Sequence, residues 1–145
     1  MDFFTSMRLS ASGLSAQRLR MNLISGNLAN LHTTRTAQGG PYRRKDAVFA
    51  AQPQGASFRE ILAARQIPYE AEVRVVEIVE DPEAVIKKFD PRHPDADEQG
   101  YVLLPDINLM EEMVNMISAT RSYEANVAAM RAAKTMVMKA LEIGA

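Results

Sequence analysis

The chain has 145 residues, of which 47% are hydrophobic, and a formal net charge of −1. This length suits one modest domain, and the near-neutral charge balance argues against a nucleic-acid-binding protein. The sequence contains no cysteine, which excludes disulfides and a cysteine nucleophile, and no apolar run is long enough to predict a membrane span.

The prolines divide the chain into three parts. All seven lie between Pro41 and Pro105, so both ends are free of proline. Because proline interrupts helices, this distribution predicts long terminal helices around a centre of loops and short strands. We therefore expect a mainly α fold with a small β element. Residues 1–32 and 106–145 would form one core domain as a coiled coil, with residues 33–105 as a central proline-rich loop and β region.

The N-terminal segment repeats apolar residues at a seven-residue spacing. The repeat consists of Met7, Leu14, Met21 and Leu28. A strict seven-residue repeat places these side chains on one face of a helix, and it is typical of a coiled-coil surface. The N-terminal helix therefore needs a partner helix to bury this face.

Charge is distributed unevenly between the N-terminal third and the rest. Residues 1–45 hold seven basic residues and one acidic residue, a net of +6, whereas the remainder holds ten basic and seventeen acidic residues, a net of −7. This asymmetry favours attraction between the ends or between neighbouring copies; a basic nucleic-acid-binding arm and an organellar transit peptide are the alternatives. The asparagine-rich end of the first helix is not needed for targeting, and the sequence has no apolar core of a secretory signal peptide.

Turn and strand signals mark the central segment. Residues 39–41 read Gly-Gly-Pro and predict a turn. Residues 42–49 begin basic and end apolar, and residues 71–79 are rich in the β-branched residues of strands. Residues 57–65 could form a short helix or a loop. We expect a small β unit with long connections.

The acidic segment after residue 90 suggests two interpretations. Asp95, Asp97 and Asp106 fall at the first, third and twelfth positions of a calcium-binding loop. The last position of such a loop is normally glutamate, and the upstream prolines preclude a regular incoming helix. A proline-stiffened turn is therefore the main interpretation, and a calcium-responsive module is the alternative.

Catalytic constellations are missing from the sequence. His32 and His93 lie in separate expected loops, and there is no nucleophile elbow or phosphate-binding glycine loop. We therefore expect neither an enzyme nor a bound cofactor.

The C-terminal segment carries the stronger heptad pattern. Its members are Leu109, Met116, Tyr123, Met130 and Val137, with Met113, Val127 and Leu141 each four residues after one of them. Asn108 and Glu111 predict a capped start to this helix. Five of the nine methionines lie between residues 110 and 136, and methionine suits either adaptable core filling or a surface that repacks against non-identical neighbours.

Both ends also carry motifs of a known family. Residues 11–17 read ASGLSAQ, residues 25–30 read SGNLAN, and residues 121–126 read RSYEAN. These motifs resemble the N- and C-terminal signatures of the bacterial flagellar rod and hook proteins.

Central motifs narrow the resemblance. GPYRR at residues 40–44, DPRHPDAD at residues 90–97 and GYV at residues 100–102 resemble the C-type proximal-rod branch of that family. The resemblance implies a non-enzymatic structural subunit that transmits torque and lines the export channel. It also implies export through the flagellar type III apparatus without a cleaved signal peptide, and a place in the periplasmic rod of the basal body. The implied partners are copies of the chain, other rod proteins and the export apparatus.

The resemblance assigns roles to the patterned residues. The two heptad series, including Met113, Val127 and Leu141, would form the assembly seam, and Asn27 and Asn30 would fix its register through amide hydrogen bonds. Asn126 and His93 would be further interaction residues, His93 within a stiff strut between copies. A cytosolic coiled-coil adaptor or export regulator is the alternative from another functional class.

Overall fold

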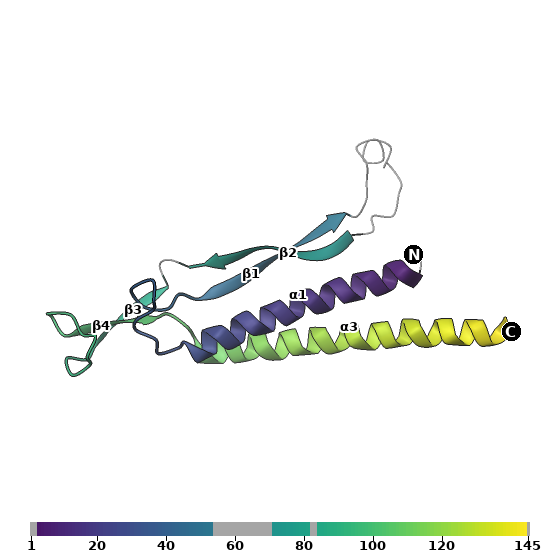
Figure 1. Ribbon diagram of the computed structural model, residues 1–145. Coiled ribbons are helices and arrows are strands. Elements are labelled where there is room, and N and C mark those ends of the chain that lie inside the picture. The colour runs from purple at the N-terminus through teal and green to yellow at the C-terminus, as the bar shows by residue number, and fades with distance from the viewer. Residues whose placement is uncertain (1–2, 54–70, 82–83, 145) are drawn as a thin grey trace, which may run out of the picture.

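Two long helices and two β-hairpins make up the described part of the computed structural model, which covers residues 3–53, 71–81 and 84–144 (Figure 1). In chain order the elements are α1 (Phe3–Ala29), β1 (Lys45–Pro53), β2 (Ala71–Glu80), β3 (Val85–Phe89), β4 (Tyr101–Pro105) and α3 (Leu109–Ile143). The prediction of a mainly α chain with a small β element is confirmed, and the structure shows that the strands pair antiparallel.

Helix α1 ends a few residues earlier than expected. Its last turn passes into a hydrogen-bonded turn in which the Asn30 amide donates to the Gly26 carbonyl, 3.1 Å, and the Thr33 amide donates to the Asn30 carbonyl, 3.1 Å. The Asn30 side chain also donates to the Gly26 carbonyl, 2.9 Å. The backbone and the side chain of Asn30 thus both bond the Gly26 carbonyl, which helps to close the helix end, where backbone carbonyls lack intrahelical partners.

Helix α3 begins at the predicted cap. The side-chain oxygen of Asn108 accepts hydrogen bonds from the backbone amides of Met110, 3.0 Å, and Glu111, 3.4 Å. These amides have no partner within the helix, so the cap stabilises its first turn. The capped start predicted at Asn108 is confirmed.

The two helices run antiparallel and side by side, with both termini at the same end of the molecule (Figure 1). Three of the residues buried along the pair are alanines: Ala16 on α1, and Ala119 and Ala133 on α3. Small side chains let two helix backbones approach closely. Gly13 extends this close contact, since a Cβ placed there would lie 3.1 Å from Nδ2 of Asn126.

The β1–β2 hairpin packs along α1 on the side away from α3 (Figure 1). Its antiparallel register runs from Lys45 opposite Glu80 to Pro53 opposite Ala71, with an irregularity between Val48 and Phe49. Ser12 of α1 ties the layers together, because its hydroxyl oxygen accepts from the backbone amide of Val73, 3.1 Å. The expected strands at residues 42–49 and 71–79 are thus present with shifted ends, whereas the expected short helix at residues 57–65 lies outside the described residues.

The β3–β4 hairpin extends beyond the end of the helix pair that is opposite the termini (Figure 1). Phe89 pairs with Tyr101 at the far end of the ladder, where their rings meet edge to face at 5.3 Å. Gly100 closes the connection with φ of +81°, and a Cβ there would lie 3.0 Å from the Phe89 ring. Only glycine tolerates both conditions.

The buried apolar core of the described residues is thin. Its members are Ala16, Ile24, Ala84, Val102, Ile107, Ala119 and Ala133. Many larger apolar side chains, among them Val76, Met110, Val114 and Met136, remain exposed. The described chain therefore buries little of its own apolar surface. Neither of its helices is long and apolar enough to cross a membrane.

We predict that Gly13→Val separates the two helices. The larger side chain would overlap Asn126, and overpacking of this kind costs about 1–3 kcal/mol. Hydrogen exchange of the α1 and α3 amides, measured by mass spectrometry, should accelerate about tenfold or more. Adding Asn126→Ala should restore part of the protection, and unchanged exchange in Gly13→Val would contradict the close packing.

Candidate functional site

A buried polar cluster joins the end of α1 to the start of α3. We use "polar cluster" for Asn27, Tyr42, Arg44, Lys45 and Glu112. Asn27 lies on the last turn of α1 and is 1% exposed, and Glu112 lies on the first turn of α3 and is also 1% exposed. Buried polar groups of this kind are stable only when hydrogen-bonded.

Asn27 uses its whole hydrogen-bonding capacity. Its amide nitrogen donates to the Lys45 carbonyl, 2.9 Å, and to Oε2 of Glu112, 3.1 Å. Its amide oxygen accepts from the Lys45 backbone amide, 3.0 Å, and from the Tyr42 hydroxyl, 3.1 Å. The side chain pairs with the Lys45 backbone as a neighbouring strand would, and so anchors the start of β1 on α1.

Glu112 is held by a charged partner as well as by Asn27. Nε of Arg44 lies 2.8 Å from Oε1 of Glu112, while its Nη1 lies 3.4 Å from the exposed carboxylate of Asp46. Burial opposes the charge on Arg44, but the hydrogen bond and the negative charge of Glu112 raise the pKa of the Arg44 guanidinium above its usual value. The guanidinium therefore remains a permanent cation beside Glu112.

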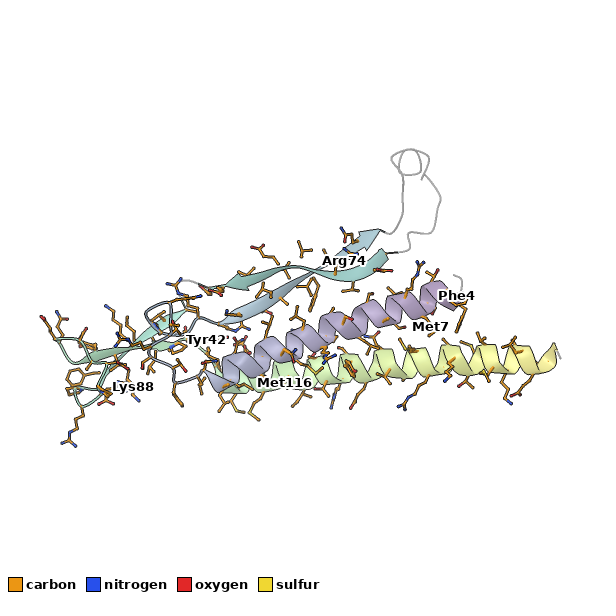
Figure 2. The ribbon with its side chains drawn as sticks, in the orientation of Figure 1. Phe4, Met7, Tyr42, Arg74, Lys88 and Met116 are labelled. Carbon is orange, nitrogen blue, oxygen red and sulfur yellow. The ribbon has the colours of Figure 1, made fainter. Side chains whose placement is uncertain are left out.

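Tyr42 completes the polar cluster at the end of the helix pair from which β3 and β4 extend (Figure 2). Burial raises the pKa of its phenol above the usual value, with the charges of Glu80 and Glu112 acting in the same direction and Lys45 opposing them. The hydroxyl thus stays protonated and can donate to Asn27.

The polar cluster can fix register. Asn27 and Glu112 face each other only when α1 and α3 pair at one offset, and Lys45 meets Asn27 only when β1 docks there. A slip by one residue would bury these groups without partners, and an unpaired buried charge is strongly destabilising. The cluster is therefore a positional lock rather than a catalytic arrangement.

The predicted register residues have different surroundings. Asn27 lies at the centre of the polar cluster, whereas Asn30 makes local bonds at the end of α1. Asn126 packs on Gly13 and donates to the Ser122 carbonyl, 3.0 Å. His93 lies in the loop between β3 and β4, where its Nδ1 accepts from the Asp95 amide, 3.1 Å. All of these contacts lie within one chain, so the predicted roles of these residues between copies stay predictions.

The predicted seam residues divide into two groups. Nine are half-buried: Met7, Leu14, Met21, Leu28, Met116, Tyr123, Val127, Met130 and Val137. Met7 and Met116 mark this series near opposite ends of the helix pair (Figure 2). The other three, Leu109, Met113 and Leu141, are exposed. The heptad series is thus half-buried over most of its length and exposed at both ends of α3.

Sequence reasoning missed the residues buried deepest in α3. Glu112, Ala119 and Ala133 are spaced at multiples of seven residues, but they are small or polar, so a pattern of large apolar residues does not reveal them. The buried pair of Arg44 and Glu112 was missed for a related reason: the two residues are 68 positions apart. The spacing of Ala119 and Ala133 by two heptads was the signal that could have found the two alanines.

The acidic loop is organised by its own hydrogen bonds. Asp97 accepts from the amides of Gln99, 2.9 Å, and Tyr101, 2.8 Å, and Asp95 accepts from the Thr34 hydroxyl, 2.7 Å. Within residues 3–53, 71–81 and 84–144, no three acidic, histidine or cysteine side chains are grouped to hold a metal ion. The described geometry gives the calcium interpretation no support.

We predict that Glu112→Ala removes most of the exchange protection of α1 and α3. Arg44 and Asn27 would lose their buried acceptor, and breaking such a pair costs about 3–5 kcal/mol. Asp46→Ala is the matched control because it removes the exposed partner of Arg44, and exposed pairs contribute roughly 1 kcal/mol or less. Similar hydrogen exchange in the two variants would contradict the central role of Glu112.

Comparison with known proteins finds two family matches. Residues 7–35 match the family described as "Flagella basal body rod protein", and residues 98–143 match "Flagellar basal body rod FlgEFG protein C-terminal". These segments contain most of α1 and all of α3.

Individual relatives match nearly the whole chain. The "Flagellar basal-body rod protein FlgC" of Bacillus subtilis is 46% identical, with 99% of each chain covered. The protein of the same name from Borreliella burgdorferi is 42% identical over 99% of this chain and 98% of its own, and that of Salmonella typhimurium is 35% identical over 94% and 93%.

Proposed function

The chain belongs to the family of FlgC flagellar basal-body rod proteins, and we propose on that premise that it transmits torque as a structural subunit of the proximal rod. The observation that carries the proposal is similarity along the whole length of the chain, including both helices and both hairpins. Membership of a structural family also means that the chain is not an enzyme. The alternative of a cytosolic adaptor or export regulator is not favoured by these relatives.

The helix pair supports a role in assembly. We propose that α1 and α3 act as a coiled coil, that this core domain of residues 1–32 and 106–145 lines the inner tube of a helical assembly, and that the export channel runs inside it. Two features support this: the helices pack antiparallel along each other, and large apolar side chains of α3 remain exposed. Exposed apolar surface of this extent is typical of an interaction site.

The central region, residues 33–105, would pack outward and bridge to neighbouring subunits. The loop that contains His93 is well suited to a stiff strut. Its turns are closed by the His93 amide bonded to the Asp90 carbonyl, 3.2 Å, and by the Gly100 amide bonded to the Asp97 carbonyl, 2.9 Å. A shaft under load needs such stiffness, because a flexible connection would store torque instead of passing it on.

The proposed partners are copies of this chain, other rod proteins and the flagellar type III export apparatus. The proposed location is the periplasmic part of the basal body, reached without cleavage of a signal peptide. The uneven charge supports contacts between copies, since the N-terminal third is basic and the remainder acidic. Asn27, Asn30 and Asn126 would then set the register of the seam.

Val127 is the residue at which we test the proposed seam. This residue is half-buried and lines a groove of about 510 Å³ together with Tyr123, Glu124, Ala128 and Arg131. A neighbouring helix could insert a ridge of side chains into such a groove. A carboxylate at position 127 would lie in this groove beside Glu124 and Arg131, and a neighbouring helix packed there would have to bury its charge.

We predict that Val127→Asp abolishes rod assembly while the variant is still exported. The measurements are the yield of basal bodies and swimming in cells that carry only this variant, with the exported protein recovered from the medium. Val127→Thr is the matched control because it keeps the branched shape without a charge, and it should retain most assembly. Normal motility with Val127→Asp would refute the proposed seam.

A further inference from the structure

Exposed apolar side chains gather at the two ends of α3. The first group consists of Leu109, Met110, Met113, Val114 and Ile117, each 46–68% exposed. At about 100° per residue, these five positions fall on one side of the helix, nearly opposite the line of Ala119 and Ala133 that contacts α1. We call this group the starting face of α3.

The second group lies on the last turns, which we call the final segment, Met136–Ile143. Met136, Met138, Leu141 and Ile143 are 52–87% exposed there. These side chains point to several sides of the helix and share it with the exposed ion pair of Lys139 and Glu142, so the segment offers more apolar surface than an ordinary solvated helix end. Within the described residues, α1 does not cover this segment.

The starting face and the final segment match in length. At about 1.5 Å per residue, the starting face extends for roughly 12 Å along α3, and the final segment extends for roughly 10 Å. A helical end of that size can lie along the starting face and cover it.

The two regions also carry opposite charges. Residues 105–120 contain Asp106, Glu111 and Glu112 and no lysine or arginine, whereas residues 131–143 contain Arg131, Lys134 and Lys139 and one acidic residue, Glu142. Glu112 is neutralised by Arg44, so the charge available at the starting face is that of the exposed Asp106 and Glu111. Lys139 is likewise paired with Glu142, 2.7 Å, so the positive charge available beside the final segment is that of Arg131 and Lys134, which immediately precede it. Opposite charges beside two apolar surfaces favour one orientation of docking.

We propose that the final segment of one copy packs on the starting face of a second copy of this chain. The inference rests on the proposed function, because it names the partner of the assembly surface. The contact joins two different surfaces, so it is not self-complementary and can continue from copy to copy. It also gives Leu109, Met113 and Leu141, the three seam residues left exposed by the helix pair, a place in the seam between copies.

The contact cannot form within one chain. Met113 and Leu141 lie on the same continuous helix, 28 residues apart in the sequence, which corresponds to about 42 Å. A short cross-link between these positions therefore reports two copies in contact. The sequence has no cysteine, so introduced thiols are the only ones in the chain.

The test uses the full chain carrying Met113→Cys and Leu141→Cys, expressed in cells and treated with a short bis-maleimide linker in isolated basal bodies. We expect covalent dimers and longer ladders of this chain. Each single cysteine variant should give no ladder, and neither should Val76→Cys with Leu141→Cys, which moves one thiol to an exposed apolar position on β2.

The outcomes separate the inference from the proposed function. Basal bodies that contain the double variant but give no ladder would overturn the inference and leave the function standing. Absence of the wild-type chain from basal bodies would contradict both. Should the double variant fail to assemble, a photoreactive residue at position 117 of the otherwise wild-type chain decides the question. Attachment to residues 136–143 of another copy supports the proposal, and attachment to a different protein or to residues 54–70 of the same chain overturns it.

Discussion

The buried amide of Asn27 is the constraint on which the rest of the structure depends. Its four hydrogen bonds reach the Glu112 side chain, the Lys45 backbone and the Tyr42 hydroxyl, so α1, β1 and α3 must meet at one point. Apolar contacts alone would tolerate several offsets of a helix pair, because neighbouring heptads present similar surfaces. The buried charge of Glu112 makes the alternatives costly, since each would leave it without Arg44. The register of the helix pair is thus set by polar groups at one end. This register also determines where the small residues farther along the two helices meet.

The thin apolar core explains why this chain is suited to assembly with neighbours. Alanines at the centre of the pair bring the helices close but bury little apolar area, and burial stabilises by roughly 25 cal/mol per Å². The larger side chains of α3 are left on the outside. Such a chain is well defined in register but leaves apolar surface to be covered by neighbours, which is what a rod subunit requires. The hydrogen-bonded loop between β3 and β4 adds a stiff projection at the end opposite the termini, and this projection is a second surface for neighbours.

Much of this architecture is legible in the sequence. The proline distribution predicts the terminal helices, Asn108 predicts the start of α3, and the β-branched stretch at residues 71–79 predicts β2. The β3–β4 hairpin and the deepest helix contacts are not predictable in the same way. Ala119 and Ala133 matter because their small side chains let the two helix backbones approach closely, and a hydrophobicity pattern does not reveal this. Arg44 and Glu112 find each other only through the complete fold, so no local pattern marks them as a pair. Asn27 is recognisable as a polar residue at the end of a heptad series, but its partners are not.

A double-mutant cycle between Asn27 and Glu112 tests the central claim most directly. Hydrogen exchange of the α1 and α3 amides would be compared in the wild-type chain, Asn27→Ala, Glu112→Ala and the double variant. If one polar cluster sets the register, each single substitution disrupts the same hydrogen-bonded cluster. The second substitution should then add little to the first, so that the coupling free energy between Asn27 and Glu112 is about 1 kcal/mol or more. Strictly additive effects would show that the two residues stabilise the helix pair independently and would contradict the account.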